Sequence, residues 1–324
     1  MASSKRSWKK GLLVVAVVCA SAFVFLVVAV GMVVLWAVST AARLGEPTAE
    51  PVTRTVAVGE SSALETPGAA PSTDVPLRLN IELQDGTFDI RPGPPGTDVT
   101  IEGDYAAPYY ELVEERDTDQ DGRRTIVIGL QPIHSMLVRI VAALRSQGEG
   151  VSNNLTVTIP EGVPIDLVLN LSAGESQTDL GGLTLTNLEA DLSMGEHHLD
   201  FSRPLAQELP RVRVSGRMGD VHLENIGNAR ALEFETSSRM GNFNVDLGGD
   251  WSVETVAELV FNHSLGDLRL NVPESVRIAT DSERSVTLGE SCGFGTVHGT
   301  DDPAAPVVRL HISTTMGETR LRRY

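Results

Sequence analysis

The chain has 324 residues, 41% of them hydrophobic and only 5% aromatic, which is ordinary for a packed protein and excludes disorder throughout. Its net charge of −17 is unevenly spread, because residues 1–43 carry +5 with no acidic residue, which leaves −22 on residues 44–324. Nucleic acids bind basic patches, so an acidic body excludes DNA and RNA as expected partners.

An uncharged apolar segment lies near the amino terminus. Residues 11–38 are almost wholly apolar, and as a helix they would span roughly 42 Å, more than the ~30 Å hydrocarbon core of a bilayer. The alternative is a cleaved signal peptide, whose apolar region has only about 7–15 residues. We therefore predict a single transmembrane helix over residues 11–38. Basic residues predominate before it, which predicts a cytoplasmic tail of residues 1–10 and an extracytoplasmic location for everything that follows, at the cell membrane.

The next segment, residues 39–75, changes composition. It is rich in Ala, Thr, Ser and Glu, its apolar residues follow no sustained period, and it contains Pro47, Pro51, Pro67 and Pro71. Such segments are extended spacers. We expect residues 39–75 to be a stalk and residues 76–324 to form the folded domain.

A glycine recurs along that domain, usually between an apolar residue and an acid or its amide. The positions are Gly174, Gly195, Gly219, Gly241, Gly266, Gly295 and Gly317. The intervals of 21, 24, 22, 25, 29 and 22 residues indicate an internal repeat that begins near residue 165. Positions two and four after each glycine are mostly apolar, and the position between them is mostly polar, which is typical of a half-buried strand.

Large apolar side chains directly precede six of these glycines. They are Met194, Met218, Met240, Leu265, Phe294 and Met316. We expect this Met/Leu/Phe column to lie in the core. Units this short cannot bury an apolar face alone and must stack. The predicted fold class is therefore mainly β, a repetitive β-solenoid, whereas the alternative β-propeller needs about 40–50 residues per blade.

Between the stalk and the repeat, short alternating segments predict antiparallel strands. These segments are residues 77–83, 88–90, 99–101, 110–113 and 125–130, with a turn expected over residues 84–87. Two further strands, residues 155–159 and 165–171, are expected to open the repeat region. One amphipathic helix is predicted over residues 132–147 from its apolar stripe, which comprises Ile133, Met136, Leu137, Ile140, Val141 and Leu144. We expect this stripe to pack on the end or flank of the repeat as a cap, and the alternative is a surface for lipid or a partner.

Several of these segments carry a family resemblance. The opening LRLNIELQDGTFDI, the later LTVTIPEGVPIDLVLNLSAGES and the repeated MGD and LGD motifs, behind an anchor and a stalk, resemble the bacterial putative-adhesin family of membrane-anchored β-solenoids. The chain is also similar to the C-terminal domain of membrane proteins that respond to cell-wall-active antibiotics. The resemblance covers residues 77–324 and implies a shape, but it brings no catalytic residues.

A serine-hydrolase pattern occurs near the carboxyl terminus. Residues 289–293 read G-E-S-C-G, and Asp301, Asp302 and His311 follow Ser291 in hydrolase order. That motif requires a turn from a strand into a helix, and no helical pattern follows Gly293. We expect no enzymatic activity and no cofactor.

Two groups of residues raise the question of a metal. Asp117, Asp119 and Asp121 resemble the start of a calcium loop, but the twelfth position is Ile128 where an EF-hand needs glutamate. We interpret them as a solvated turn with weak calcium capacity at most. His197, His198 and His222 are close in repeat register, and stacking of the units would place His198 and His222 in one outward column, but zinc needs further ligands. The acids directly after the glycines are expected on the same face, and charge pairing along a solvated ladder explains both columns better.

Two functions follow from these features. The first is a structural or protein-interaction module, held beyond the membrane and facing an envelope or neighbouring protein. The alternative is an accessory regulator of an envelope-stress signalling system, acting through the membrane helix because the ten-residue tail is too short for a signalling domain.

Overall fold

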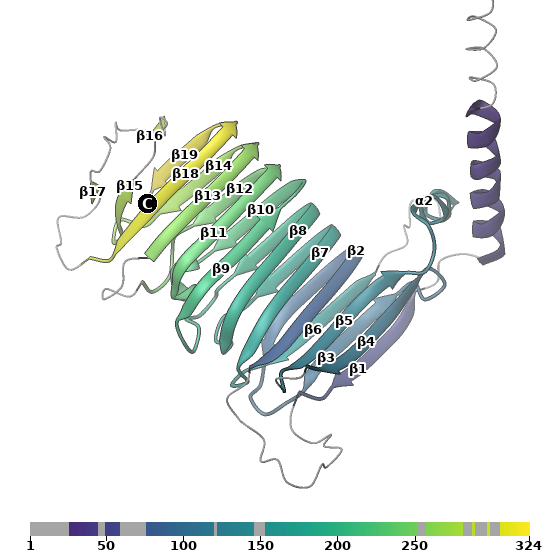
Figure 1. The fold of residues 1–324 in the computed structure, drawn as a ribbon, viewed down its shortest axis with the longest axis horizontal. Coiled ribbons are helices and arrows are strands. Elements are labelled where there is room, and N and C mark those ends of the chain that lie inside the picture. Colours follow the sequence, from purple (N-terminus) through teal and green to yellow (C-terminus); the bar gives the residue numbers. More distant parts are fainter. Residues whose placement is uncertain are drawn as a thin grey trace, which may run out of the picture. The chain divides into compact units, whose positions relative to one another are not determined.

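The computed structural model describes residues 26–44, 49–58, 76–119, 122–145, 153–251, 257–280, 287–288, 297–298 and 305–324. The fold is mainly β, with its strands in one open sheet (Figure 1). The chain divides into two compact units. We call residues 1–48, 107–109 and 133–151 the helical unit and the remainder the β unit.

The elements follow in chain order. The helical unit contains the N-terminal helix Leu26–Leu44 and α2 Met136–Arg145. The first strands of the β unit are β1 Glu50–Val56, β2 Leu77–Gly93, β3 Val99–Tyr105, β4 Tyr110–Thr118, β5 Arg124–Pro132 and β6 Asn154–Pro160. The middle strands are β7 Ile165–Asp179, β8 Leu185–Asp200, β9 Leu209–Gly216, β10 Gly219–Glu224, β11 Ala231–Met240, β12 Asn242–Asp246, β13 Ala257–Leu265 and β14 Leu268–Val272, with a short 3-10 helix at Ile226–Ala229. The last are β15 Arg277–Thr280, β16 Thr287–Leu288, β17 Val297–His298, β18 Val307–Met316 and β19 Thr319–Arg323.

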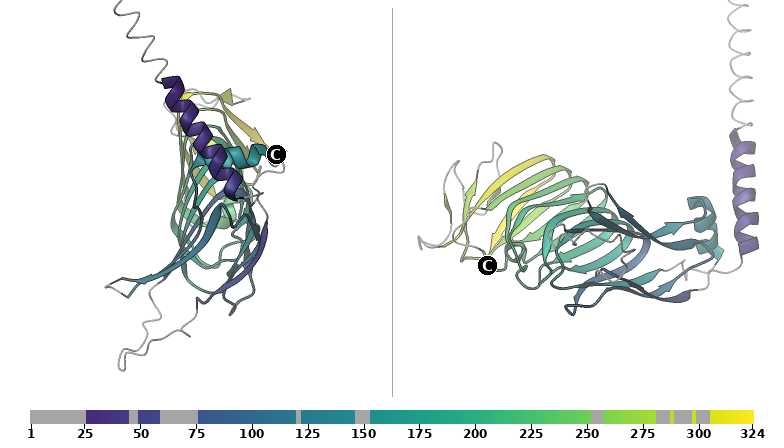
Figure 2. Two further views of the ribbon diagram at one scale, coloured as in Figure 1. Left: turned by 90° about the vertical axis from the view of Figure 1, so that its right-hand side faces the viewer. Right: turned by 60° about the horizontal axis from the view of Figure 1, so that its bottom comes forward.

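Parallel pairing joins successive glycine-centred units. Strands before the glycine pair in the order β2, β7, β8, β9, β11, β13 and β18, and strands after it in the order β2, β7, β8, β10, β12, β14 and β19. The strands β2, β7 and β8 run through their glycine and take part in both rows. Figure 1 labels these strands side by side, and Figure 2 shows the same rows from two further directions.

The alternating pattern of the sequence builds the core through these registers. One column of paired positions consists of Leu79, Leu167, Leu188, Val212, Phe234, Leu259 and Leu310. Every member is at most 1% exposed. Because each strand pairs in register with the next, its inward residues meet the inward residues of both neighbours, and one face is buried along the whole row.

The strand β2 departs from the expectation of a turn and of antiparallel pairing. It continues through residues 84–87 and pairs in parallel with β7, with Gly86 opposite Gly174. Asp85 adopts a left-handed conformation with φ 57°, which bends the strand without reversing it. The predicted turn is therefore wrong, and β2 belongs to the parallel rows. The pairs β1–β3, β3–β6 and β4–β5 are antiparallel.

The last units do not stack in sequence order. The strand β18 pairs directly with β13, and β15 pairs with the other side of β18. Gly317 therefore follows Gly266 in space, although 51 residues separate them in sequence. Gly295, which was expected between them, lies outside the described residues.

Part of the predicted stalk is a strand. Strand β1 pairs with β3 along its full length, and Val56 and Val58 are buried. Main-chain hydrogen bonds hold this edge strand, so it needs no apolar period, and a composition argument could not detect it. The interpretation of residues 39–75 as wholly unpacked is wrong for residues 50–58.

The N-terminal helix also extends beyond its predicted end at residue 38. It continues to Leu44, and within this extension Ser39 and Thr40 donate their hydroxyl groups to the carbonyl oxygen of Trp36 at 2.9 Å, so both polar side chains are satisfied within the helix. Residues 11–25 of the predicted span lie outside the described residues.

Candidate functional site

The glycines form a column in which each backbone touches the next. A Cβ built on Gly219, Gly241 or Gly266 would lie 1.9–2.1 Å from the carbonyl oxygen of the preceding glycine. The φ angles of these three residues are between +119° and +132°, a region that favours glycine. The column brings together Gly86, Gly174, Gly195, Gly219, Gly241, Gly266 and Gly317. Its role is to let neighbouring units approach, so these are structural positions and not ligand-binding ones.

Short polar side chains directly after the glycines bind the next unit. Asp220 Oδ1 accepts from the Asn242 side-chain nitrogen at 2.9 Å, and Asn242 Oδ1 accepts from the backbone N–H of Asp267 at 3.2 Å. Asp267 Oδ1 in turn accepts from the backbone N–H of Glu318 at 3.1 Å. The acids in this column were expected to serve a solvated charge ladder. These contacts show that part of the column instead holds successive units together.

Five large apolar residues before the glycines are exposed, which contradicts the expected core position of the Met/Leu/Phe column, and its sixth member, Phe294, lies outside the described residues. The exposed fractions are 46% for Met194, 43% for Met218, 46% for Met240, 37% for Leu265 and 62% for Met316. The chain bends at the glycine, so the inside–outside alternation of the preceding strand does not continue into the next one. We call these five residues the methionine row. They form an unbroken series of large apolar side chains, one from each successive unit, on the outside of the β unit.

The three histidines considered for zinc do not lie together. His197 is buried, and its Nδ1 lies 2.9 Å from Ser176 Oγ. Burial lowers the pKa of His197, and burial lowers the pKa of the core residue His263 to about 4. Both therefore pack as neutral side chains in the core at neutral pH.

His198 and His222 instead stack on the outer face with their ring centroids 4.3 Å apart. Glu196, which the sequence reasoning did not include, lies 3.1 Å from His198 Nε2 and 3.8 Å from His222 Nε2. The three residues offer ligand atoms within 4.8 Å of one another and could hold a metal ion. The interplanar angle of 9° directs the ring nitrogens along parallel lines, so convergence on one ion requires a ring to turn.

The candidate calcium turn is held by its own backbone. Asp117 Oδ1 accepts from the N–H of Thr118, and Asp119 Oδ1 accepts from the N–H of Arg123, both at 2.8 Å. Asp121 lies outside the described residues, as do Ser291, Asp301 and Asp302 of the hydrolase pattern. His311 belongs to β18 and pairs with Val260 of β13.

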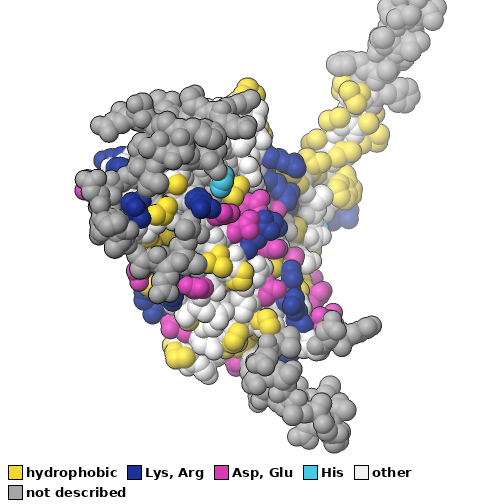
Figure 3. Space-filling view, turned by 60° about the vertical axis from the view of Figure 1, so that its left-hand side comes forward, with side chains coloured by type: hydrophobic (Ala, Val, Ile, Leu, Met, Phe, Trp, Pro, Cys, Tyr) yellow, Lys and Arg dark blue, Asp and Glu magenta, His cyan; other side chains and the backbone are white. Residues whose placement is uncertain are grey.

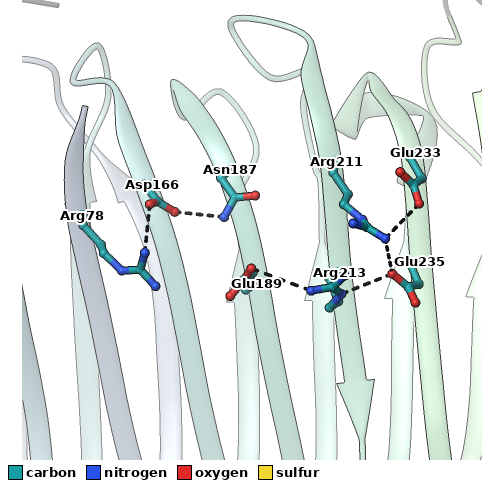
Figure 4. Close-up of polar contacts among 8 residues, drawn as sticks. All are labelled: Arg78, Asp166, Asn187, Glu189, Arg211, Arg213, Glu233 and Glu235. Carbon is teal, nitrogen blue, oxygen red and sulfur yellow. Dashed lines mark hydrogen bonds and ion pairs between the residues drawn. The ribbon is translucent and has the colours of Figure 1, made fainter. Parts of the chain in front are cut away.

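A ladder of alternating charges crosses the strands before the glycines (Figure 4). Arg78 contacts Asp166 at 3.4 Å, and Arg211 and Arg213 contact Glu235 at 2.7 and 3.2 Å. These arginines are 39–44% exposed, so the pairs contribute little to stability. Figure 3 likewise shows acidic and basic side chains interleaved on one face of the molecule. The ladder is a solvated surface with no concentration of one charge.

Comparison with known proteins finds a family match for the first part of this sheet. The family model described as the N-terminal domain of toast_rack, DUF2154, matches residues 72–224. This part of the chain is therefore similar to that domain. The resemblance to the putative-adhesin family is thereby confirmed. The match ends at Glu224, the last residue of β10, so Met240, Leu265 and Met316 lie after it along the chain.

Solved structures show similarity at low identity. A putative cell adhesion protein from Clostridium sporogenes is 11% identical with a TM-score of 0.41, over 86% of this chain and 100% of that one. A putative adhesin from Bacteroides fragilis is 10% identical with a TM-score of 0.33, over 86% and 100%. A putative adhesin from Parabacteroides merdae is 11% identical with a TM-score of 0.26, over 86% and 98%. No curated protein matches the chain.

Proposed function

We propose that this protein is a membrane-anchored, extracytoplasmic interaction module of the cell envelope, and that its glycine-centred units are the coils of a β-solenoid. The proposal includes no enzymatic activity. The parallel registers and the glycine column support the solenoid, because each unit buries its apolar face only against its neighbours.

The anchor in this proposal is the N-terminal helix. Leu26–Leu44 has a mean hydropathy of 1.9, and only 11% of it is buried against the rest of the protein. An apolar helix with so little protein cover has the character of a lipid-facing segment. The basic residues before it favour a cytoplasmic amino terminus.

The observation that carries the interaction role is the methionine row. Contiguous apolar side chains on a soluble surface mark contact sites, and methionine adapts its shape to different partners. Exposed acids follow three members of the row, at Glu196, Asp220 and Glu318, and exposed arginines directly precede two, at Arg217 and Arg239. The occupant is therefore a protein segment with an apolar stripe flanked by side chains of both charges.

Photocrosslinking in intact cells tests this role. A benzophenone amino acid replaces Met218 in one variant and Leu232, an exposed leucine of β11 outside the row, in the control. We expect a crosslinked partner from position 218 only, with a several-fold lower yield when Met194 and Met240 are both changed to serine. Equal crosslinking from both positions would refute the assignment of the row, and crosslinks to a second copy of the chain would replace the partner with self-association.

A further inference from the structure

The helix α2 presents an apolar face that nothing in the described residues covers. Ile133 just before the helix is 49% exposed, and within it Met136, Leu137, Ile140 and Leu144 are 67%, 44%, 43% and 77% exposed. The expected cap is therefore wrong, because these are the residues that were to pack on the repeat. The buried positions are the intervening Val138 and Ala142.

The location of α2 in the fold indicates what covers this face. The helix belongs to the helical unit, together with the N-terminal helix and residues up to 48, and not to the β unit. In the N-terminal helix the buried residues are Ala37 and Ala41, near its carboxyl end. Both helices thus bury small or compact side chains spaced four residues apart, which suits close helix packing. The helix α2 therefore belongs to the same unit as the carboxyl end of the N-terminal helix. In the proposed topology this end emerges on the outer side of the membrane.

The positive charge of residues 132–145 also favours contact with the membrane. Residues 132–145 include Arg139 and Arg145 and no acidic residue, whereas residues 44–324 as a whole carry −22. A basic segment in an acidic ectodomain complements an anionic surface. Apolar residues with arginine on a short helix are the composition of helices that lie in a lipid interface.

We propose that α2 lies in the headgroup region of the outer leaflet, with Met136, Leu137, Ile140 and Leu144 inserted toward the acyl chains. The occupant of the exposed face is the anionic lipid surface itself. This inference rests on the proposed membrane anchor. With α2 in the interface, the helical unit has two attachments to the bilayer, so its orientation relative to the membrane is fixed as well as its distance from it.

Fluorescence of the full-length chain in vesicles tests the placement. Single cysteines replace Leu144 in α2, Leu232 in the β unit and Met32 in the N-terminal helix, each in a background with Cys19→Ser and Cys292→Ser. All three native residues are exposed on the protein surface. Each cysteine carries an environment-sensitive NBD label in vesicles of phosphatidylcholine and phosphatidylglycerol. Circular dichroism confirms that each variant is folded.

The expected result is a clear contrast between the labels. Nitroxide lipids quench the labels at positions 144 and 32, and aqueous iodide quenches position 144 several-fold less than position 232. If position 32 is quenched by lipid but position 144 is as open to iodide as position 232, the anchor holds and the placement of α2 is wrong. Shielding of position 144 from both quenchers would also refute it, because protein would then cover the face. Failure of lipid to quench position 32 would overturn the anchor itself.

Discussion

The glycine column gives the most demanding prediction, the effect of Gly241→Ala. The new Cβ would lie 1.9 Å from the carbonyl oxygen of Gly219, whereas such contacts are not closer than about 3 Å in real proteins. The two units must therefore separate locally by about 1 Å. This separation weakens the hydrogen bond from Met240 N–H to Arg217 O and the contact of Asn242 with Asp220.

The magnitude follows from these contacts. Two hydrogen bonds at about 0.5–1.5 kcal/mol each, and about 1–2 kcal/mol for alanine at a left-handed φ, give a loss of roughly 2–5 kcal/mol in the free energy of unfolding. Gly96→Ala is the matched control, because Gly96 has φ +76° but no atom within 4 Å of the added Cβ. It should cost only the conformational part, about 1–2 kcal/mol.

Hydrogen exchange and urea-dependent proteolysis of the detergent-solubilised chain measure both effects. Gly241→Ala should speed exchange in β10 and β12, which pair on either side of the contact, while Gly96→Ala leaves those strands protected. If the two variants lose equal stability, close backbone contact does not explain the recurring glycine, and the argument for the column fails.

Three further predictions concern single side chains. Met218→Asp and Met240→Asp should each change the free energy of unfolding by less than about 0.5 kcal/mol in urea titrations, because both side chains are exposed. A loss of several kcal/mol would show that these side chains are buried in the core. His263 has a folded pKa of about 4 against about 6.5 when unfolded, so the unfolded chain binds the proton first, and stability should fall by up to about 3 kcal/mol as the pH drops from 6.5 to 4. His263→Leu should reduce this pH slope, and an unchanged slope would contradict a neutral core histidine. Asn153→Ala should cost about 2–5 kcal/mol in the same titrations, because the buried amide accepts from Ala106 N–H at 3.0 Å and donates to the Asp85 carbonyl at 2.8 Å; a loss below about 1 kcal/mol would show that water replaces it.

Local periodicity was sufficient to predict many of the strands and the helix. Alternation over residues 77–83 and 165–171 predicted parts of β2 and β7, because a strand buries every second residue whatever its partner. The stripe from Met136 to Leu144 predicted α2 for the equivalent reason at helical period. These signals depend only on neighbours along the chain.

The surroundings of a side chain and the pairing partner of a strand could not be predicted in the same way. An apolar residue indicates that something covers it, but not which surface does so, and this is why Met218 and Ile140 were assigned to a core they do not enter. Strand pairing between residues far apart in the sequence was also not predicted. Examples are the pairing of Gly86 with Gly174 and of Leu265 with Met316. The repeat register did predict the outward column of His198 and His222, and the pairing of β8 with β10 confirms it, but it did not predict that Glu196 would approach both rings.

Cysteine labelling in spheroplasts tests most directly the claim that the β unit is held outside the cytoplasm by the N-terminal helix. In a background with Cys19→Ser and Cys292→Ser, Leu232→Cys and Ser3→Cys are treated with a membrane-impermeant maleimide before and after permeabilisation. We expect position 232 to be labelled in intact spheroplasts and position 3 only after permeabilisation, and we expect both variants to stay in the membrane fraction. Labelling of position 3 but not of position 232 in intact spheroplasts would contradict this topology. Release of the β unit from the membrane fraction, as expected if the N-terminal segment were a cleaved signal peptide, would contradict the anchor.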